Sequence, residues 1–237
     1  MNLFLCASKY KHRELCERPI AKSIGYISHV QDGEYHVFTL NEKGDTLVIL
    51  PENTLPICKA YNKLIKDRLI NSSVKYERIV FVHDDVIIED RHLEDKLEKY
   101  LKTYDIIGLA GGVEPEIKAP ALWHLMCKRH FGTVGHYLNG KWYGTTFGVS
   151  DTRVAIVDGV FIGVNRSVLV EKNLRFDEDL PHFHHYDILF CLEANAIKLK
   201  IGVVPILITH LSPGLTNVSK AYLDSEKVFL NKASRFS

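Results

Sequence analysis

Short apolar runs alternate with amphipathic helical segments along this chain of 237 residues, and no other feature restricts its fold as strongly. Alternation of this kind is typical of an α/β domain, in which helices pack against a sheet. The predicted strands cover residues 3–6, 35–40, 46–50, 78–82, 106–110, 154–164 and 202–209. No repeat or Pro/Ser-rich linker divides the sequence, so we expect a single α/β domain.

Three amphipathic helices are predicted from apolar residues that recur at helical spacing. They cover residues 56–68, 91–104 and 186–199. Residues 115–152 mix aromatic residues and glycines without a steady period, which is typical of an active-site flap or of an inserted loop. From residue 219 on we expect a peripheral helix and a frayed end, so that residues 1–218 form the domain and residues 219–237 a tail.

Charge and cysteine content narrow the classes of partner and compartment. The 30 Lys and Arg residues nearly balance the 29 Asp and Glu residues, which gives no electrostatic basis for binding nucleic acid. The five cysteines are scattered without metal-binding or redox spacing, as expected of free thiols in a reducing compartment. The apolar run at the N-terminus is too short for a signal sequence or a membrane span. We therefore expect a cytoplasmic protein, a location that is compatible with peripheral attachment to a membrane.

Polar side chains directly follow two of the predicted strands. His83, Asp84 and Asp85 come after the fourth strand, and His210 follows the last one. Ligands of open α/β sheets bind beyond the carboxyl ends of strands, and adjacent carboxylates at such a place suit Mg²⁺ or Mn²⁺. Two plainer interpretations stay open: Asp84 and Asp85 cap a turn, and His210 is a hydrogen-bonded structural residue.

Two further acids are candidates for chemistry. Asp187 lies near the first turn of the third predicted helix, where the helix dipole favours the ionised form that a general base needs. Charge complementarity at the helix N-terminus is an equally simple reason for an acid at this place. Asp158 interrupts an apolar strand, and a buried carboxylate requires a turn, a substrate hydroxyl or a cation as its partner.

The order of these motifs resembles that of the GT-A glycosyltransferases, most closely a bacterial and viral glycosyltransferase-like family related to family 2. The resemblance covers about residues 60–214. It is carried by Ala60-Tyr61-Asn62, Phe81-Val82-His83-Asp84-Asp85-Val86, Asp105-Ile106-Ile107-Gly108, Asp158-Gly159, Arg175-Phe176-Asp177-Glu178, Phe183-His184-His185-Tyr186-Asp187 and the pattern His210-x-Ser-x-Gly, which ends at Gly214. The second of these segments is similar to the family's form of the DxD motif. The resemblance implies one GT-A domain with a mixed, mostly parallel sheet flanked by helices.

The resemblance also implies a metal and a donor. Asp85 aligns with the family's metal-binding Asp, His83 stands where many members carry the first Asp of the motif, and His210 completes the shell around Mn²⁺ or Mg²⁺. The expected donor is a nucleotide-sugar, with a UDP-sugar favoured. The residues expected to contact its nucleotide are Ala7, Ser8, Asn53, Asn62, His83 and Asp84.

For the transfer itself, Asp187 matches the acid that commonly serves as catalytic base in this family, with Glu178 as the alternative. The reaction would invert the anomeric carbon and deliver the sugar to a hydroxyl of a glycan, lipid-linked or protein acceptor. Trp142 offers an aromatic ring face to a sugar, and a glycine after a strand lets the backbone approach the donor. The expected substrate contacts are Asp158, Gly112, Trp142 and His184.

Two other classes of function stay open on the sequence alone. A zinc metallohydrolase would use His182, His184 and His210 together with Asp158, because histidine-rich shells suit zinc. A non-catalytic nucleotide-sugar-binding module would hold the donor without turning it over. Activity with Mn²⁺ and a nucleotide-sugar, and none with simple esters, separates the transferase from the hydrolase.

Overall fold

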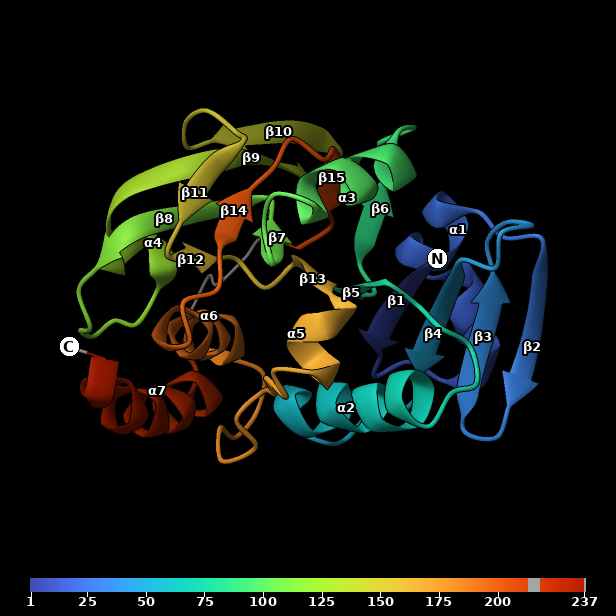
Figure 1. Ribbon diagram of the computed structural model, residues 1–237, viewed down its shortest axis with the longest axis horizontal. Coiled ribbons are helices and arrows are strands. Elements are labelled where there is room, and N and C mark those ends of the chain that lie inside the picture. The colour runs from blue at the N-terminus through green and yellow to red at the C-terminus, as the bar shows by residue number, and fades with distance from the viewer. Residues whose placement is uncertain (213–217, 237) are drawn as a thin grey trace.

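The computed structural model of the chain describes residues 1–212 and 218–236. Within that part, nine strands form a large sheet in the order β11-β14-β7-β13-β5-β1-β4-β3-β2 (Figure 1). These strands are β1 (Asn2–Ala7), β2 (Ser28–Asp32), β3 (Tyr35–Thr39), β4 (Thr46–Leu50), β5 (Arg78–Val82), β7 (Ile106–Gly108), β11 (Thr152–Val154), β13 (Phe161–Asn165) and β14 (Ile201–Val203).

Parallel and antiparallel pairs are mixed in this sheet. β1 is parallel to both β4 and β5, and β14 is parallel to β7. β13 runs antiparallel between β5 and β7, and the antiparallel strands β3 and β2 extend the sheet beyond β4. The predicted α/β class and mixed sheet are confirmed. The expectation of mostly parallel pairing is wrong, because the antiparallel pairs, including β11 with β14, outnumber the parallel ones.

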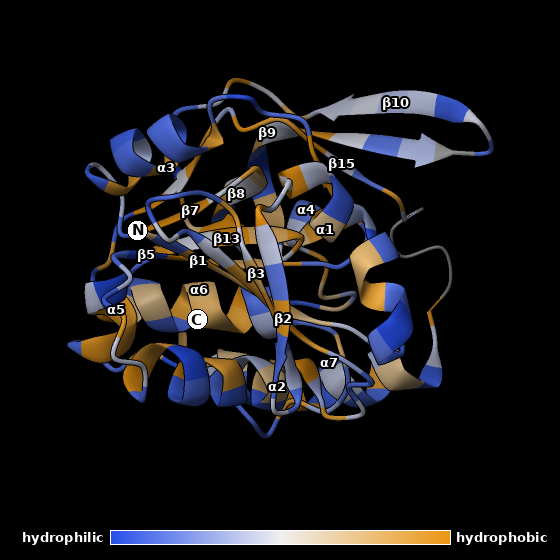
Figure 2. Ribbon diagram, turned by 90° about the vertical axis from the view of Figure 1, so that its right-hand side faces the viewer, coloured by the Kyte–Doolittle hydropathy of each residue, from blue (hydrophilic) through white to orange (hydrophobic). Residues whose placement is uncertain are grey.

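A smaller sheet packs beside the large one and runs in the order β12-β8-β9-β15-β6, with β10 paired to β9. Its strands are β6 (Val86–Ile88), β8 (Ala110–Pro115), β9 (Cys127–Leu138), β10 (Lys141–Thr146), β12 (Ile156–Val157) and β15 (Ile208–His210). The hairpin of β9 and β10 projects from the body of the molecule (Figure 2). The segment at 115–152, where a flap or loop was expected, is therefore mainly a short helix and this hairpin.

Helices cover both faces of the large sheet. They are α1 (Pro19–Ile24), α2 (Ile57–Leu64), α3 (Leu93–Leu101), α4 (Trp123–Met126), α5 (Arg166–Val170), α6 (Tyr186–Ala196) and α7 (Lys220–Ala233), with the 3₁₀ helices η1 (His12–Glu17) and η3 (Ser234–Phe236) and the π-helical turn η2 (Ile65–Ile70). Figures 1 and 2 show α2, α5, α6 and α7 on one face, and α3 with the small sheet on the other. No helix within residues 1–212 or 218–236 combines the length and the apolar character that a membrane crossing requires.

The central strand β5 shows why the sequence folds in this way. It lies between β1 and β13, and its residues 79–82 are fully buried. A strand that is covered on both faces consists of a continuous apolar run, and this run ends where the polar residues His83, Asp84 and Asp85 begin. The fold therefore places these three side chains at the edge of the large sheet where β5 ends.

Two predicted strands are each divided between the two sheets. The run at 154–164 is broken at Asp158 and Gly159, so that β12 joins the small sheet and β13 the large one. The run at 202–209 is broken at Pro205, which lacks the N–H that a strand ladder needs, so that β14 and β15 also separate. Each division places the end of a strand at the boundary between the sheets, where the cavities described below lie.

The C-terminal helix α7 packs against α6 and contributes to the core. Its residues Tyr222, Phe229 and Ala233 are buried, and the ring of Phe229 stacks on that of His185 at a centroid distance of 5.3 Å. The last residue of the predicted His210-x-Ser-x-Gly pattern, Gly214, lies outside the described residues.

Candidate active site

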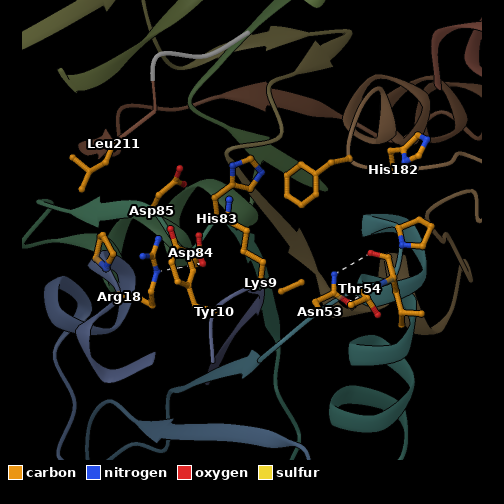
Figure 3. Close-up of a pocket in the computed structure, with 15 residues that line it drawn as sticks. Lys9, Tyr10, Arg18, Asn53, Thr54, His83, Asp84, Asp85, His182 and Leu211 are labelled. Carbon is orange, nitrogen blue, oxygen red and sulfur yellow. Dashed lines mark hydrogen bonds and ion pairs between the residues drawn. The ribbon is translucent and has the colours of Figure 1, made fainter. Parts of the chain in front are cut away.

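A cavity of about 670 Å³ lies beyond the ends of β1, β4 and β5 (Figure 3). Because these three strands are parallel, their carboxyl ends meet at one edge of the sheet, which is where ligands of α/β sheets bind. We name this space the first cavity. Its lining residues are Ala7, Lys9, Tyr10, Arg18, Pro19, Asn53, Thr54, Leu55, Pro56, His83, Asp84, Asp85, His182, Phe183 and Leu211.

A second cavity of about 420 Å³ adjoins the first, and both are lined by His83, Asp85 and Phe183. It lies between the small sheet and the N-terminal end of α6. Its other lining residues are Ala121, Leu122, Trp123, His124, Asp158, Gly159, Val160, His184, His185, Tyr186, Asp187, Ile188, His210, Ser212 and Tyr222. Since three residues belong to both cavities, molecules bound in the two would meet at His83 and Asp85.

Asp84 is held by the wall of the first cavity. Ser8 Oγ donates to its Oδ2 over 2.5 Å, and Nε of Arg18 lies 3.3 Å from the same oxygen. The guanidinium of Arg18 stacks on the ring of Tyr10, 3.6 Å from its centroid. Figure 3 shows Arg18, Tyr10 and Asp84 together on one side of the cavity, with Asn53 and Thr54 on the other. The Asp84 carboxylate therefore orders the cavity wall and is less available to a cation than its neighbour.

Asp85, His83 and His210 come together between the cavities. One potential ligand atom from each lies within 4.8 Å of the others, and Oδ1 of Asp85 is 3.3 Å from Nε2 of His210. This oxygen is buried and accepts no hydrogen bond from the described residues. Burial acts to raise the pKa of Asp85, but the imidazoles of His210 and His83 outweigh it, and the pKa is lower than usual. The carboxylate is thus kept ionised.

The tautomer of His83 follows from its hydrogen bonds. The hydroxyl of Tyr186 donates to the carbonyl oxygen of Gly159 over 2.8 Å, because a carbonyl can only accept. The same hydroxyl lies 2.8 Å from Nε2 of His83, so it must accept from an Nε2–H group. Nδ1 of His83 is then the unprotonated nitrogen. A metal-binding histidine commonly has this arrangement, with its second ring nitrogen donating to a neighbouring group.

Asp187 lies in the second cavity at the start of α6. Its Oδ2 accepts a hydrogen bond of 2.9 Å from the backbone N–H of Gly159. Burial, followed by the nearby negative charge of Asp158, raises the pKa of Asp187 to about 7, although backbone N–H groups act in the opposite direction. The backbone N–H groups at the helix start favour the ionised form, as expected, but burial and the charge of Asp158 outweigh them.

Asp158 is engaged by its own neighbours. Its Oδ2 accepts from the indole Nε1–H of Trp123 over 2.8 Å, and its Oδ1 accepts from the backbone N–H of Val160 over 2.9 Å. Glycine follows it, and a Cβ at Gly159 would lie 2.3 Å from the hydroxyl oxygen of Tyr186, so a larger residue would displace the ring or the turn. This close approach lets Asp158 and Asp187 share one cavity.

The residues expected at the nucleotide divide into two groups. Ala7 and Asn53 line the first cavity together with His83 and Asp84, whereas Ser8 is buried behind Asp84. Asn62 lies on α2 and lines neither cavity. Its side chain bonds the backbone N–H and carbonyl of Phe176 and one oxygen of Glu178. Asn62 thus fixes the 176–178 segment to α2.

Three other expected site residues, Glu178, Gly112 and Trp142, line neither cavity. Glu178 is exposed and lines neither cavity. Gly112 is enclosed in the small sheet, where a Cβ would lie 2.5 Å from Cβ of Cys127. Its lack of a side chain therefore serves sheet packing.

Trp142 points away from the cavities. In the hairpin, Tyr143 pairs with His136, whose ring lies 6.2 Å from that of His210, so this face of the hairpin is turned to the site. Neighbouring residues of a strand point to opposite faces, and Trp142 accordingly contacts Tyr137 and is 56% exposed. The indole that reaches the second cavity is that of Trp123.

The histidines of the zinc alternative are not gathered. His182 lines the first cavity and His184 the second, and in the described ranges the one cluster with metal-ligand spacing is that of His83, Asp85 and His210. His182 instead faces Asp224 at 4.0 Å. This distribution does not support the hydrolase interpretation.

Several cavity residues were not foreseen from the sequence. Lys9, Tyr10 and Arg18 belong to the segment between β1 and α1, which has no periodic pattern. Trp123 and Tyr186 were within motifs or aromatic-rich segments, but their hydrogen-bond partners are 35 and 103 residues away in the sequence. A concentration of polar residues after the first strand was the available signal for Lys9 and Tyr10.

Comparisons with known proteins agree with this architecture. A family model described as "Glycosyltransferase like family" matches residues 22–232, whereas no curated protein matches the sequence. The fold is similar to that of GalNAc-T7, solved with UDP, GalNAc and Mn²⁺ (TM-score 0.56, 9% identity, 98% of this chain and 48% of that one). It is also similar to the mannosyltransferase PcManGT of Pyrobaculum calidifontis in complex with GDP-Man and Mn²⁺ (0.53, 10%, 99% and 69%) and to S. aureus TarS in complex with UDP (0.51, 13%, 100% and 73%). These likenesses confirm the predicted GT-A fold.

Proposed function

The chain belongs to the glycosyltransferase-like family matched over residues 22–232, and we propose that, as a glycosyltransferase, it moves a sugar from a nucleotide-sugar to an acceptor hydroxyl with the help of a divalent cation. The observation that carries the proposal is the cluster of His83, Asp85 and His210, because it lies where the first and second cavities meet. We assign the donor nucleotide to the first cavity and the acceptor to the second.

The residues of the cluster fit a divalent cation. Asp85 offers a buried oxygen without a hydrogen bond, and His83 offers an unprotonated Nδ1. Two imidazoles beside one carboxylate favour Mn²⁺ over Mg²⁺, which prefers oxygen ligands. The Mn²⁺ of GalNAc-T7 and PcManGT supports this choice. When bound, such a cation supplies positive charge that stabilises the departing diphosphate.

The first cavity suits a nucleoside diphosphate. Arg18 and Lys9 bring positive charge to its lining, and guanidinium groups bind phosphate oxygens well. UDP and GDP-Man are bound by TarS and PcManGT, whose folds are similar to this one. Among nucleotides we favour UDP, on the resemblance of the sequence motifs.

In the second cavity, Asp187 is the proposed base. It would take the proton of the acceptor hydroxyl as that oxygen bonds to the anomeric carbon and the bond from this carbon to the diphosphate breaks, with inversion. A base is most effective when its pKa is near the working pH, and the pKa of Asp187 is about 7. Asp158 is the less suitable base because both its oxygens already accept hydrogen bonds.

Nucleotide binding and turnover test the proposal separately. Calorimetry with UDP and with GDP, each with and without Mn²⁺, should show cation-dependent binding to the wild type. His210→Ala should weaken it at least tenfold, and extra Mn²⁺ should restore part of the loss. His92→Ala, on an exposed residue before α3, is the control and should bind normally.

Release of free nucleotide from UDP-sugars and GDP-sugars in the presence of glycan acceptors measures turnover. Cation-dependent binding without any turnover would favour the binding module. Binding that is indifferent to Mn²⁺ in both the wild type and His210→Ala would remove the cation from the proposal.

A further inference from the structure

Three histidines form a continuous chain of hydrogen bonds beside the first cavity. Nδ1 of His12 lies 2.8 Å from Nε2 of His36, and Nδ1 of His36 lies 2.8 Å from Nε2 of His29. The three rings come from η1, β3 and β2 respectively. At one end, Nε2 of His12 is 3.6 Å from Oε2 of Glu52, and at the other, Nδ1 of His29 is 3.6 Å from Sγ of Cys16.

The carboxylate of Glu52 gives this chain a direction. A carboxylate 3.6 Å away favours an N–H group over a lone pair facing it, so we assign the proton of His12 to Nε2, and Nδ1 of His12 accepts. Nε2 of His36 must then donate to His12, which leaves Nδ1 of His36 to accept from Nε2–H of His29. The remaining nitrogen, Nδ1 of His29, can accept from the thiol of Cys16. With one proton on each imidazole, every internal contact of the chain has one donor and one acceptor.

The chain of histidines joins two walls of the first cavity. His12 and Cys16 lie on η1, which connects the cavity residues Tyr10 and Arg18. Glu52 directly precedes Asn53 on the opposite wall, and its backbone N–H donates to the carbonyl of Tyr10 over 2.9 Å. The ring of His36, which is 5% exposed, is the central link. Its hydrogen bond to His12 ties η1 to β3, and its hydrogen bond to His29 ties β3 to β2.

We propose that His12, His29 and His36 are positioning residues of the donor site, which hold η1, and with it Tyr10 and Arg18, in place for nucleotide binding. The role rests on the proposed function of the first cavity. None of the three histidines lines that cavity, so they act through the wall.

The chain of histidines also sets a pH below which this wall of the first cavity loses its order. The titratable groups that face it are Glu52, Cys16 and, in edge contact with His29, Tyr26, while Phe38 stacks on His29 as an apolar neighbour. Protonation of His36 sets its Nδ1–H against Nε2–H of His29 and breaks that link.

Burial and the neighbouring imidazoles both act against protonation of His36. Burial first, and then the charges of His29 and His12, lower the pKa of His36. A histidine with a lowered pKa stabilises the fold above its usual pKa, and this contribution is lost as the pH falls through the lowered value. The contribution of the chain to nucleotide binding is therefore expected at neutral pH and lost in acid.

His36→Phe tests the role, because it keeps a flat ring beside Phe38 and removes both hydrogen bonds. With Mn²⁺ present at pH 7.5, we expect the Kd for UDP or GDP to rise about tenfold while kcat stays within about twofold. His36→Gln, which retains one donor and one acceptor, should give an intermediate Kd. His92→Phe is the control for an exposed histidine and should match the wild type.

Two further readouts exclude a purely structural effect. The ratio of the Kd of His36→Phe to that of the wild type should shrink toward one as the pH falls from 7.5 to 5.5, and effects of the metal site cancel in this ratio. Nitrogen-15 NMR of the imidazoles should show Nε2–H tautomers for all three histidines at pH 7.5. An unchanged Kd in His36→Phe, or an Nδ1–H tautomer at His36, would overturn the inference alone. Failure of the wild type to bind either nucleotide would overturn the proposed function and this role with it.

Discussion

The hydroxyl of Tyr186 accepts a hydrogen bond from Nε2 of His83 over 2.8 Å and at the same time donates to the carbonyl of Gly159. Through this one group, the first residue of α6 determines which nitrogen of a histidine at the end of β5 is free. The next residue of α6 is Asp187. One residue of the first turn of α6 therefore orients the proposed metal ligand His83, and the next residue of that turn is the proposed base.

Replacement of Tyr186 by Phe removes the acceptor that fixes His83. We expect the affinity for Mn²⁺ to fall about 10- to 100-fold, because loss of a group that orients a metal-binding histidine typically has this effect. Mn²⁺ titration followed by electron paramagnetic resonance measures the change. Tyr76→Phe, which removes a buried hydroxyl bonded to Thr46 far from the cluster, is the matched control. Equal losses in both variants would show that His83 is not a ligand.

Asp84 and Asp85 should respond differently to the same substitution. Asp85→Asn replaces an ionised oxygen of the cluster by a neutral amide and should weaken Mn²⁺ binding at least tenfold. Asp84→Asn should leave Mn²⁺ binding nearly intact, but should lower stability by about 1–2 kcal/mol, since it weakens the contacts with Ser8 and Arg18. Calorimetry and thermal unfolding of both variants decide the matter, and the reverse ranking for Mn²⁺ would refute the assignment.

Asp187→Asn keeps the shape of the side chain but cannot take a proton. We expect kcat to fall about a hundredfold or more, with little change in donor or metal affinity. In the wild type, kcat/KM should rise with pH through about 7, because only the ionised carboxylate is a base and its pKa is about 7. The variant should lack this rise. Near-normal turnover of Asp187→Asn would mean that the base is another residue.

The same acid makes a prediction about stability. Its pKa is raised in the folded state above the usual value of about 3.9, so its stabilising contribution is complete below that value and is lost as the pH rises through about 7. Asp187→Asn should therefore unfold at the same temperature as the wild type near pH 4 and at a higher temperature at pH 8. Parallel melting curves over that range would contradict a raised pKa.

Gly159→Ala tests the close approach of β12 and α6. The added Cβ would lie 2.3 Å from the hydroxyl oxygen and 2.6 Å from Cζ of Tyr186, so the ring or the turn must move. Overpacking of this kind costs about 1–3 kcal/mol. We expect a lower melting temperature together with weaker Mn²⁺ binding. Gly144→Ala, where a Cβ meets nothing within 4 Å, is the control and should change neither.

The positions of Asp85 and His210 at the ends of strands could be predicted from the sequence. β5 is a continuous apolar run because it is buried on both faces, so its end at His83 was visible, and His210 likewise ends the last apolar run. These features are local, since they depend on where an apolar segment stops. The sequence placed His83 at the nucleotide, and its place beside His210 was not foreseen because it depends on how two segments far apart in the sequence pack together.

The places of other expected residues depend on pairing between segments far apart in the sequence. Trp142 and Tyr143 are neighbours of equal aromatic character, and only the register with β9 decides which of them faces the site. Glu178 and Asp187 both lie in matching motifs, yet Glu178 is bonded to Asn62 on α2 and lines neither cavity. Pro205 was the one local signal that the last apolar run is divided between two sheets.

The burial of β5 also determines how the site responds to fluctuations of the fold. β5 is paired on both edges, to β1 and β13, and its residues 79–82 are covered on both faces. Amide protons in such a strand exchange with solvent only when the whole domain unfolds, whereas exposed segments such as the β9–β10 hairpin exchange by local opening. The free energy of opening measured from amide exchange in β5 should therefore equal the free energy of global unfolding. His83 and Asp85 follow this strand within three residues, so we expect conditions that leave the domain folded to keep the backbone at these two residues in place.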